Sequence, residues 1–389
     1  MKIAILTSGI LPVPAVQGGA VEQLIDHYLE YNNRHCLHDI TVFSVWHEAV
    51  EGCRELQSEV NHYRYIDVSS RWARIRKGLH GLLHRHTYYH YSMDFFFRQA
   101  MKVITGNDYD IIVLENRPGY ALHLRGKTRA RLIYHLHNDL LNSSTLCGGA
   151  IYEAADGILA VSDYIRRRVA TCNERDEKTV TVYNGIDVGA FAHPQVISRE
   201  QIGFKADDFV LVFSGRLIRE KGILELVEAM RMLKEVGRIK LLIIGSSFYD
   251  NSHGDSAFIT ELKGAAAELA DRIVFTGYVK HSMMGSYLHL ADVAVIPSLW
   301  EEPFGLTIVE GMAAGLPVIT TDGGGIPEIV TEGNAIVLPL SDNLSGSLAK
   351  AILHLYKNED MRKRMGEVSR RLSVNYSKEA YAKNFFDAI

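Results

Sequence analysis

The chain has 389 residues, of which 47% are hydrophobic, and a formal net charge of -4. This length allows two domains with full-sized cores, and the charge argues against nucleic acid as a partner. The four cysteines lack a C-x-x-C or zinc spacing, which fits a reducing cytoplasm, and no apolar run reaches the roughly 18 residues of a membrane span. The first seven residues, followed soon by Pro12 and Pro14, are too short for a signal peptide, so we expect a cytoplasmic protein.

Short β-branched runs alternate with longer helical stretches along the whole chain. They predict twelve strands, at residues 2–6, 40–43, 111–114, 132–136, 157–161, 180–183, 210–213, 240–244, 273–275, 293–296, 318–320 and 335–338. This alternation is typical of parallel sheets covered by helices on both faces. Because twelve strands exceed one ordinary sheet, we predict an α/β protein of two Rossmann-like, doubly wound domains facing across a cleft. The domains would span residues 1–190 and 191–372, and a helix within 373–389 could cross back to the first domain.

The first strand is followed by two glycines, Gly18 and Gly19, just before a helix. Glycines in this place let backbone N–H groups approach a phosphate, and the helix dipole favours the negative charge. An ordinary turn is the alternative, because the pattern is not the G-x-G-x-x-G of dinucleotide-binding proteins.

A basic stretch at residues 71–90 mixes Arg, Lys and His with Trp72 and several leucines. Such a mixture can lie on an anionic membrane surface, whereas the alternative is a solvated helix face. The sequence therefore predicts possible contact with a membrane surface through 71–90, peripheral at the inner face of the cell membrane.

Polar residues stand on both sides of the predicted strand 111–114. The D-x-D at residues 108–110 precedes the strand and lies at its amino end, so we interpret it as structural and not as a metal site. Glu115, Asn116 and Arg117 follow the strand at the end where ligands bind in open α/β sheets, and we predict that they contact an acceptor.

Two histidines alternate at the end of the strand 132–136. Period two places His135 and His137 on the same side of the strand, with His137 nearer the carboxyl end. A histidine in a strand is usually part of a satisfied core. The polar residues Asn138 and Asp139 that follow favour a functional position for His137 more than for His135.

The second predicted domain opens with a strand, a glycine and two cations, in the segment FSGRLIREKG at residues 213–222. Arg216 can grip a phosphate with two hydrogen bonds, and Lys221 adds a point charge. The segment lacks G-x-x-x-x-G-K-[ST], so it is not the phosphate loop of nucleoside triphosphatases. A solvated charge cluster is the alternative.

Two carboxylates frame the segment EPFGLTIVE at residues 302–310, which follows a buried strand. Pro303 suits the first turn of a helix, and Gly315 ends that helix. Carboxylates accept hydrogen bonds only, so Glu302 and Glu310 could each hold vicinal hydroxyls of a sugar or a ribose. Exposed acids near a helix N-terminus are common for another reason, since they complement the helix dipole.

With these residues assembled, the chain resembles the retaining glycosyltransferases of family 4, which have the GT-B fold. The resemblance covers nearly the whole length, and residues 302–310 match the E-x-F-G-x4-E signature of that family. Four further segments resemble family landmarks in the same order: AVSD at 160–163, VYNGID at 182–187, SGR at 214–216 with Lys221, and GGGIPE at 323–328.

The resemblance implies a role for each matched residue. Arg216 and Lys221 would bind the donor diphosphate, Glu310 the ribose hydroxyls, and Glu302 the hydroxyls of the donor sugar. The remaining donor contacts would come from Gly18, Gly19, Tyr278, Val279, Phe304, Gly305 and Leu306. His137 would lie near the reacting sugar, so the implied catalytic group is His137, Glu302, Arg216 and Lys221, with no metal and no cofactor.

These expectations describe a retaining, metal-independent glycosyltransferase that uses a nucleotide-sugar donor and a glycan or lipid-linked acceptor. Bacterial cell-surface polysaccharide synthesis is the expected pathway. The alternatives are a nucleotide-sugar epimerase of the same fold and a non-catalytic nucleotide-sugar-binding protein. The donor base, the sugar, the acceptor and the oligomeric state cannot be read from the sequence.

Overall fold

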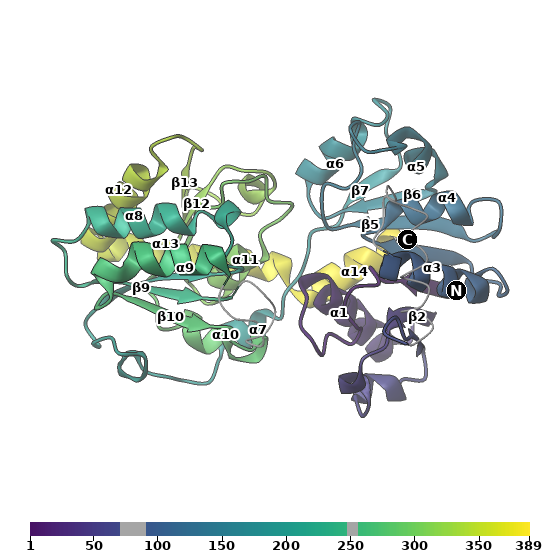
Figure 1. The fold of residues 1–389 in the computed structure, drawn as a ribbon, viewed down its shortest axis with the longest axis horizontal. Coiled ribbons are helices and arrows are strands. Elements are labelled where there is room, and N and C mark those ends of the chain that lie inside the picture. The colour runs from purple at the N-terminus through teal and green to yellow at the C-terminus, as the bar shows by residue number, and fades with distance from the viewer. Residues whose placement is uncertain (71–90, 247–255) are drawn as a thin grey trace. The chain divides into compact units, whose positions relative to one another are not determined.

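The computed structural model describes residues 1–70, 91–246 and 256–389 of the chain. They form two compact units, one of Met1–Gly185 with Lys378–Ile389 and one of Ile186–Ser377 (Figure 1). The chain therefore leaves the first unit after Gly185, whereas the sequence analysis placed this boundary after residue 190. The predicted membrane contact at 71–90 lies outside the described residues.

The first unit is built on a parallel sheet with the strand order β3-β2-β1-β4-β5-β6-β7 among the described residues. The order reverses between β1 and β4, as in doubly wound folds. Its strands are β1 (Lys2–Leu6), β2 (Asp39–Val45), β3 (Asn61–Ile66), β4 (Ile111–Glu115), β5 (Arg131–Leu136), β6 (Gly157–Ala160) and β7 (Thr179–Thr181). Its α-helices are α1 (Ala20–His35), α3 (Tyr91–Ile104), α4 (Ala121–Leu124), α5 (Gly148–Ala154), α6 (Asp163–Ala170) and α14 (Lys378–Ala388).

The second unit repeats this plan with the order β10-β9-β8-β11-β12-β13 among the described residues, all in parallel pairs. Its strands are β8 (Phe209–Ser214), β9 (Ile239–Ile244), β10 (Ile273–Gly277), β11 (Val293–Ile296), β12 (Val318–Thr321) and β13 (Ala335–Leu338). Its α-helices are α7 (Val188–Ala192), α8 (Ile223–Met232), α9 (Ala257–Ala266), α10 (His281–Leu288), α11 (Leu306–Ala313), α12 (Leu344–Lys357) and α13 (Glu359–Ser373). The predicted pair of doubly wound parallel sheets is confirmed.

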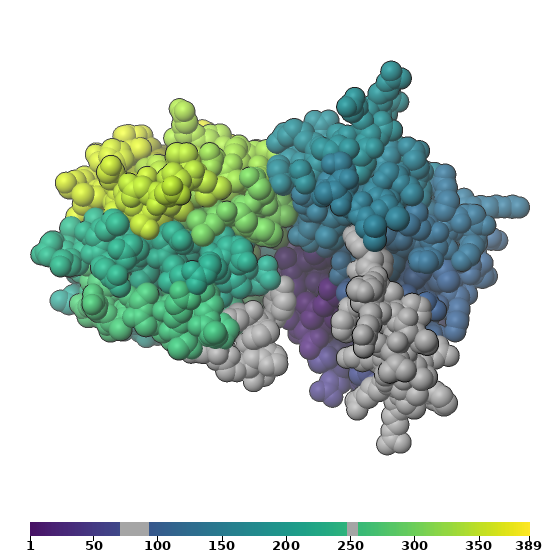
Figure 2. Space-filling view, turned by 45° about the horizontal axis from the view of Figure 1, so that its top comes forward, coloured from purple at the N-terminus to yellow at the C-terminus, as the bar shows by residue number. Residues whose placement is uncertain are grey.

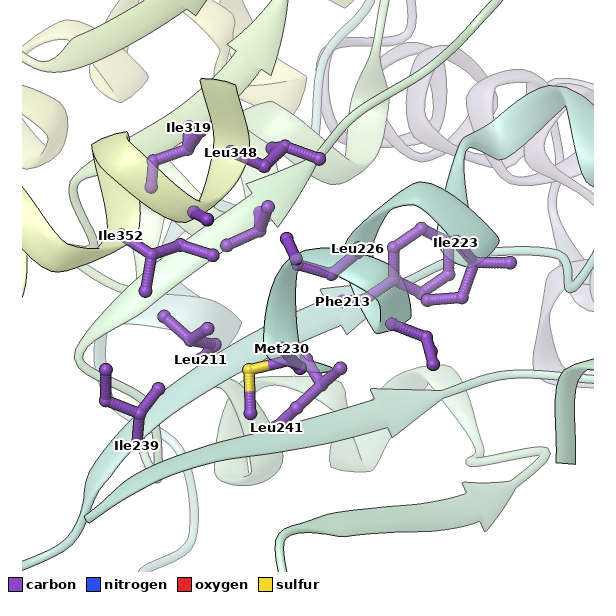
Figure 3. Close-up of a cluster of buried hydrophobic side chains, with 14 of the residues drawn as sticks. Leu211, Phe213, Ile223, Leu226, Met230, Ile239, Leu241, Ile319, Leu348 and Ile352 are labelled. Atoms are coloured by element: carbon purple, nitrogen blue, oxygen red, sulfur yellow. The ribbon is translucent and has the colours of Figure 1, made fainter. Parts of the chain in front are cut away.

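The core of the second unit lies between its sheet and the helices α8 and α12. Figure 3 shows Leu211 and Phe213 of β8 facing this layer, together with Met230 of α8 and Ile352 of α12. All six residues of β8 are buried, which explains why the strand reads as a continuous apolar run without alternation. In Figure 2 the yellow atoms of this unit, from its C-terminal part, lie at the surface of the unit. Helix α12 packs against α8 and α13.

The last helix, α14, belongs to the first unit and packs on α1. Its Phe385 ring stacks on the Tyr28 ring of α1, with centroids 4.2 Å apart and an angle of 2° between the planes. At the edge of this contact, the Lys378 Nζ atom lies 2.9 Å from a carboxylate oxygen of Glu30. The final residues of the chain therefore complete the core of the unit in which the chain begins.

In the part of the chain that the structure describes, no helix combines the length and the apolar character that crossing a membrane requires.

Candidate active site

A buried polar cluster lies where β4 and β5 of the first unit end. Glu115 closes β4 and pairs in register with His135 of β5, and His137 follows just after the strand. The Nε2 atom of His137 lies 2.8 Å from Glu115 Oε2, and the Nδ1 atom of His135 lies 3.1 Å from the same oxygen. The Tyr28 hydroxyl of α1 donates to Glu115 Oε1 at 2.9 Å. Three elements thus direct polar atoms at one carboxylate.

This surrounding sets the charges of the cluster. Burial alone would raise the pKa of Glu115, but the charge and hydrogen bonds of His135 and His137 outweigh it and lower the pKa to about 2. Burial lowers the pKa of His137 to about 4, although Glu115 acts in the opposite direction. Burial also raises the pKa of Tyr28 far above its ordinary range. At neutral pH the cluster therefore holds an ionised Glu115, a neutral His137 and a protonated Tyr28.

Among the described residues, Glu115, His135 and His137 are also the side chains that could hold a metal ion, with ligand atoms within 4.8 Å of one another. A histidine that binds a metal almost always donates its other ring N–H to a partner. Here those other atoms, His135 Nε2 and His137 Nδ1, are buried and find no hydrogen-bond partner among the described residues. The donor set therefore fits a hydrogen-bonded cluster better than a metal centre.

The buried position of Glu115 corrects one prediction. Its side chain is 0% exposed and its carboxylate already receives three side chains, so it does not contact an acceptor. Strand position predicted the correct end of the sheet, but it could not show that the side chain points into the core. Acceptor contact stays a prediction for Asn116, which is 7% exposed, and for the half-buried Arg117.

The glycine pair also lies where the sequence predicts it, directly before α1. Gly18 and Gly19 have φ angles of 78° and 99°, in the region that favours glycine, and a Cβ on Gly19 would clash with the Glu22 carboxylate. Glu22 is 4% exposed and accepts a hydrogen bond of 3.3 Å from Ser8 Oγ. Burial raises the pKa of Glu22 to about 7. The sequence analysis did not single out this carboxyl.

Asp110 of the D-x-D lies directly before β4, where its Oδ2 atom accepts a hydrogen bond of 2.7 Å from the backbone N–H of Lys2. The interpretation of the D-x-D as structural stays a prediction.

In the second unit, the loops after β8 and β11 meet at the carboxyl edge of the sheet, because these two strands are paired neighbours. Lys221 and Glu302 form an ion pair there, and Ser298 Oγ donates to the same Glu302 oxygen at 2.5 Å. The Lys221 ammonium also lies 5.4 Å from the centroid of the Trp300 ring. Glu302 Oε2 accepts no hydrogen bond from the described residues. The structure thus joins two residues that the sequence analysis assigned to the same ligand.

Gly222 allows this meeting of loops. It has a φ of 67°, and a Cβ at this position would clash with the carbonyl oxygen of Pro297 at the end of β11. The backbone N–H of Leu299 donates to the Glu220 carbonyl at 2.8 Å and closes the same contact. Arg216 is exposed after β8, and no described residue forms a hydrogen bond or ion pair with its guanidinium.

Glu310 lies on α11 and is 8% exposed, with its Oε1 atom 3.2 Å from His281 Nε2. Burial would lower the pKa of His281, but the hydrogen bond and charge of Glu310 outweigh it, so the pKa is raised above 6.5. The sequence analysis missed His281, because nothing in its spacing relates it to Glu310, which lies far along the chain.

The segment between the two glutamates is only partly helical. Helix α11 begins at Leu306, with Gly305 at the N-cap in a left-handed conformation and no side-chain cap. Pro303 therefore lies in the loop before the helix, whereas the sequence analysis placed it in the first helical turn. Phe304 is 2% exposed, and Tyr278 and Val279 are half-buried in the loop after β10. The first N–H groups of a helix lack partners within that helix, and those of Leu306 and Thr307 stand at this end of α11, whereas the Ile308 N–H donates to the Gly305 carbonyl at 3.0 Å.

Comparison with known proteins agrees with this geometry. The model described as "Glycosyltransferase Family 4" matches residues 28–189, and the one described as "Glycosyl transferases group 1" matches residues 195–372. The crystal structure of Anabaena HepE in complex with UDP and glucose superimposes with a TM-score of 0.73 at 21% identity, covering 100% of this chain and 98% of HepE. The fold and the two models together define a glycosyltransferase of the GT-B class.

Two relatives extend this comparison. YtcC of Bacillus subtilis (strain 168), itself named only as a proposed glycosyltransferase, is 25% identical over 384 residues, which cover 95% of this chain and 87% of YtcC. The phosphatidyl-myo-inositol mannosyltransferase of Mycobacterium tuberculosis is 28% identical over 234 residues, 58% of each chain. The chain belongs to the family 4 type of GT-B glycosyltransferases.

Proposed function

We propose that the protein transfers a sugar from a nucleotide-sugar donor to a glycan or lipid-linked acceptor, with retention at the anomeric carbon and without a metal. Bacterial cell-surface polysaccharide synthesis is the proposed pathway. The observation that carries the proposal is the ion pair of Lys221 and Glu302 at the carboxyl edge of the second sheet. Ligands of such sheets bind at this edge, and the pair offers them a cation and a carboxylate that accepts hydrogen bonds from hydroxyl groups.

The leaving group of this reaction is a nucleoside diphosphate, whose negative charge develops in the transition state. We propose that Arg216 and Lys221 stabilise this charge, since fixed cations contribute most where charge develops. They would take the place that a metal has in other enzymes. The exposed and unpaired Arg216 guanidinium suits a bidentate contact with phosphate.

The two glutamates would hold hydroxyl groups at two ends of the donor. Glu310 would accept hydrogen bonds from the ribose. The ribose hydroxyls would then either displace His281 from the Glu310 carboxylate or bind the carboxylate beside it. Glu302 would use its Oε2 atom for the sugar while Oε1 keeps Lys221 in position. Tyr278 and Val279 would contact the base, and the backbone of Phe304, Gly305 and Leu306 the sugar and phosphates. For the first unit we propose that Gly18 and Gly19 approach the phosphates and that His137 contacts the reacting sugar.

Several comparisons support this proposal. HepE was solved with UDP and glucose, and the mycobacterial relative is named for the transfer of mannose to phosphatidyl-myo-inositol. In the proposed mechanism, a donor phosphate oxygen removes the proton of the acceptor hydroxyl on the face from which the diphosphate leaves. The two glutamates would therefore not act as the acid and base of a glycosidase.

The test begins with a screen of nucleoside diphosphates and their sugar conjugates for thermal stabilisation, because a bound ligand stabilises the folded state by mass action. The best donor is then used with Glu310→Ala, which should weaken donor binding at least about tenfold through the loss of hydrogen bonds to a charged group. His281→Ala is the matched control. His281→Ala breaks the same Glu310–His281 contact but keeps the Glu310 carboxylate, so this variant should retain donor binding.

Equal losses in both variants would contradict the ribose role of Glu310. A wild-type protein that binds the donor but transfers nothing to any acceptor would indicate a binding protein, and recovery of an isomerised donor would indicate an epimerase. Either result would contradict the proposed transfer.

A further inference from the structure

The Glu115 carboxylate lies in the core of the first unit, fully surrounded by groups that donate hydrogen bonds to it. A carboxylate accepts hydrogen bonds only, so each ring nitrogen that faces it must carry a hydrogen. This requirement assigns the hydrogen of His137 to Nε2, at 2.8 Å from Glu115 Oε2, and one hydrogen of His135 to Nδ1. The ionised state of Glu115 maintains the requirement over the whole physiological pH range.

The opposite side of the His137 ring supports the same assignment. Among the described residues, its buried Nδ1 atom has no hydrogen-bond partner. A hydrogen on Nδ1 would leave that N–H group without a partner, at a cost of about 1–3 kcal/mol, and would also turn the Nε2 lone pair toward the Glu115 carboxylate. A neutral His137 with its hydrogen on Nε2 avoids the repulsion between that lone pair and the carboxylate.

The backbone of His137 is held by Asn116, the residue that follows Glu115. Asn116 adopts a left-handed conformation with φ 56°, which is uncommon outside glycine. Its backbone N–H donates to the His135 carbonyl at 2.8 Å, and its side-chain Oδ1 accepts from the His137 backbone N–H at 3.2 Å. Consecutive residues thus hold the ring and the main chain of one histidine.

Tyr28 connects this arrangement to the helices. Its hydroxyl donates to Glu115 Oε1, while its ring stacks on Phe385 of α14. Tyr381 of the same helix is equally buried, but its hydroxyl has no hydrogen-bond partner. The two tyrosines therefore differ in the one contact that matters for Glu115, and they form a matched pair for mutagenesis.

We propose that Glu115 is a positioning residue for glycosyl transfer, which fixes the tautomer and the orientation of the His137 ring beside the reacting sugar. The inference rests on the proposed function, because it takes His137 to contact the reacting sugar. It assigns to Glu115 a role different from the acceptor contact that its position in the sequence indicated.

The first experiment compares Glu115→Met with Glu115→Gln. Methionine removes the acceptor but keeps much of the volume, whereas the glutamine oxygen can still accept from both histidines. We expect hydrolysis of the donor without acceptor to fall on the order of 100-fold in the methionine variant, since small errors in position cost about that much. The glutamine variant should recover most of the rate, within about tenfold of the wild type. Loss of an acceptor contact would instead raise the acceptor KM and leave donor hydrolysis unchanged.

The second experiment reads the tautomer directly, by ¹⁵N NMR of the His137 ring nitrogens, assigned with a His137→Asn variant. The wild type and Glu115→Gln should show the hydrogen on Nε2, and Glu115→Met a mixture of tautomers. This readout needs no turnover. It still decides the positioning role if no nucleotide sugar proves to be a donor, an outcome that would count against the proposed function alone.

Tyr28→Phe and Tyr381→Phe provide the matched pair if the Glu115 variants do not fold. Tyr28→Phe removes one donor to Glu115 and should lower donor hydrolysis about tenfold, while Tyr381→Phe should leave it unchanged. Equal effects of both tyrosine variants would overturn the proposal. A His137 tautomer that is the same in every Glu115 variant would overturn it as well.

Discussion

Glu22 is a carboxyl that the first unit buries directly beside the Gly18–Gly19 turn. Burial raises its pKa from 4.5 to about 7, so the folded chain holds a proton that the unfolded chain has lost between these pH values. Because the folded state binds more protons there, the stability that this group contributes must fall as the pH rises from about 4.5 to 7.

The variant Glu22→Gln removes this titration. As the pH rises from 5 to 7.5, the Tm of the variant should rise relative to the Tm of the wild type. The corresponding change in the free energy of unfolding is at most about 1.4 kcal/mol per pH unit. Thermal unfolding at four pH values measures it, with the exposed Glu30→Gln as control. A difference that is constant with pH would contradict the burial of an ionisable Glu22.

Gly222 determines whether Lys221 can reach Glu302. Gly222→Ala places a side chain in a left-handed conformation and against the Pro297 carbonyl, so it should lower the free energy of unfolding by about 2 kcal/mol or more. It should also lower turnover, because the loop that carries Lys221 must move. Gly237→Ala is the control, since a Cβ there meets no atom within 4 Å and its effect should stay within about 0.5 kcal/mol. A Gly222→Ala variant as stable and active as Gly237→Ala would refute this close approach.

At this scale the sequence indicated some site residues and not others. Lys221, Glu302 and Glu310 stand out because they belong to short local patterns in the segments that follow β8 and β11. Tyr28 and His281 do not, because each acts through a side chain far away in the sequence, and no local pattern reports such a pair. Glu115 combines both cases, since its location was predictable but its inward direction was not.

Among the elements, the strands were largely predictable because most of them are buried runs of β-branched and aliphatic residues. The exception is β3, whose sequence NHYRYI is polar and half-exposed at the edge of the sheet, so it carries no strong apolar signal. The ends of strands differ from the predicted ones by a residue or two, for example at β2 and β10. Backbone pairing with a neighbour, which the sequence does not show, sets those ends.

Helix α14 is the element whose contribution is easiest to measure. Phe385 is fully buried against Tyr28, whereas its neighbour Phe386 is half-buried. Phe385→Ala should therefore cost about 3–5 kcal/mol of stability, and Phe386→Ala about 1 kcal/mol. Denaturant unfolding of the full chain compares the two. Similar losses would show that α14 does not close the core of the first unit in the way described.

At the scale of the whole molecule, two sheets of the same plan carry different chemistry at their carboxyl edges. The first unit buries one carboxylate, Glu115, among two histidines and a tyrosine, and the second brings Lys221 and Glu302 together. In both units these residues belong to short segments that follow strands, which is why the sequence could point to the segments. The resemblance to family 4 added the roles that the residue types alone left open.

Retention is tested most directly by the anomeric configuration of the transferred sugar, which ¹H NMR of the glycoside product reports. The donor is the nucleotide sugar that stabilises the protein best. We predict that an α-linked donor yields an α-linked product, with release of one nucleoside diphosphate and without added metal. A β-linked product from that donor would contradict this prediction, as would a donor that the protein binds without transferring its sugar and freeing the diphosphate.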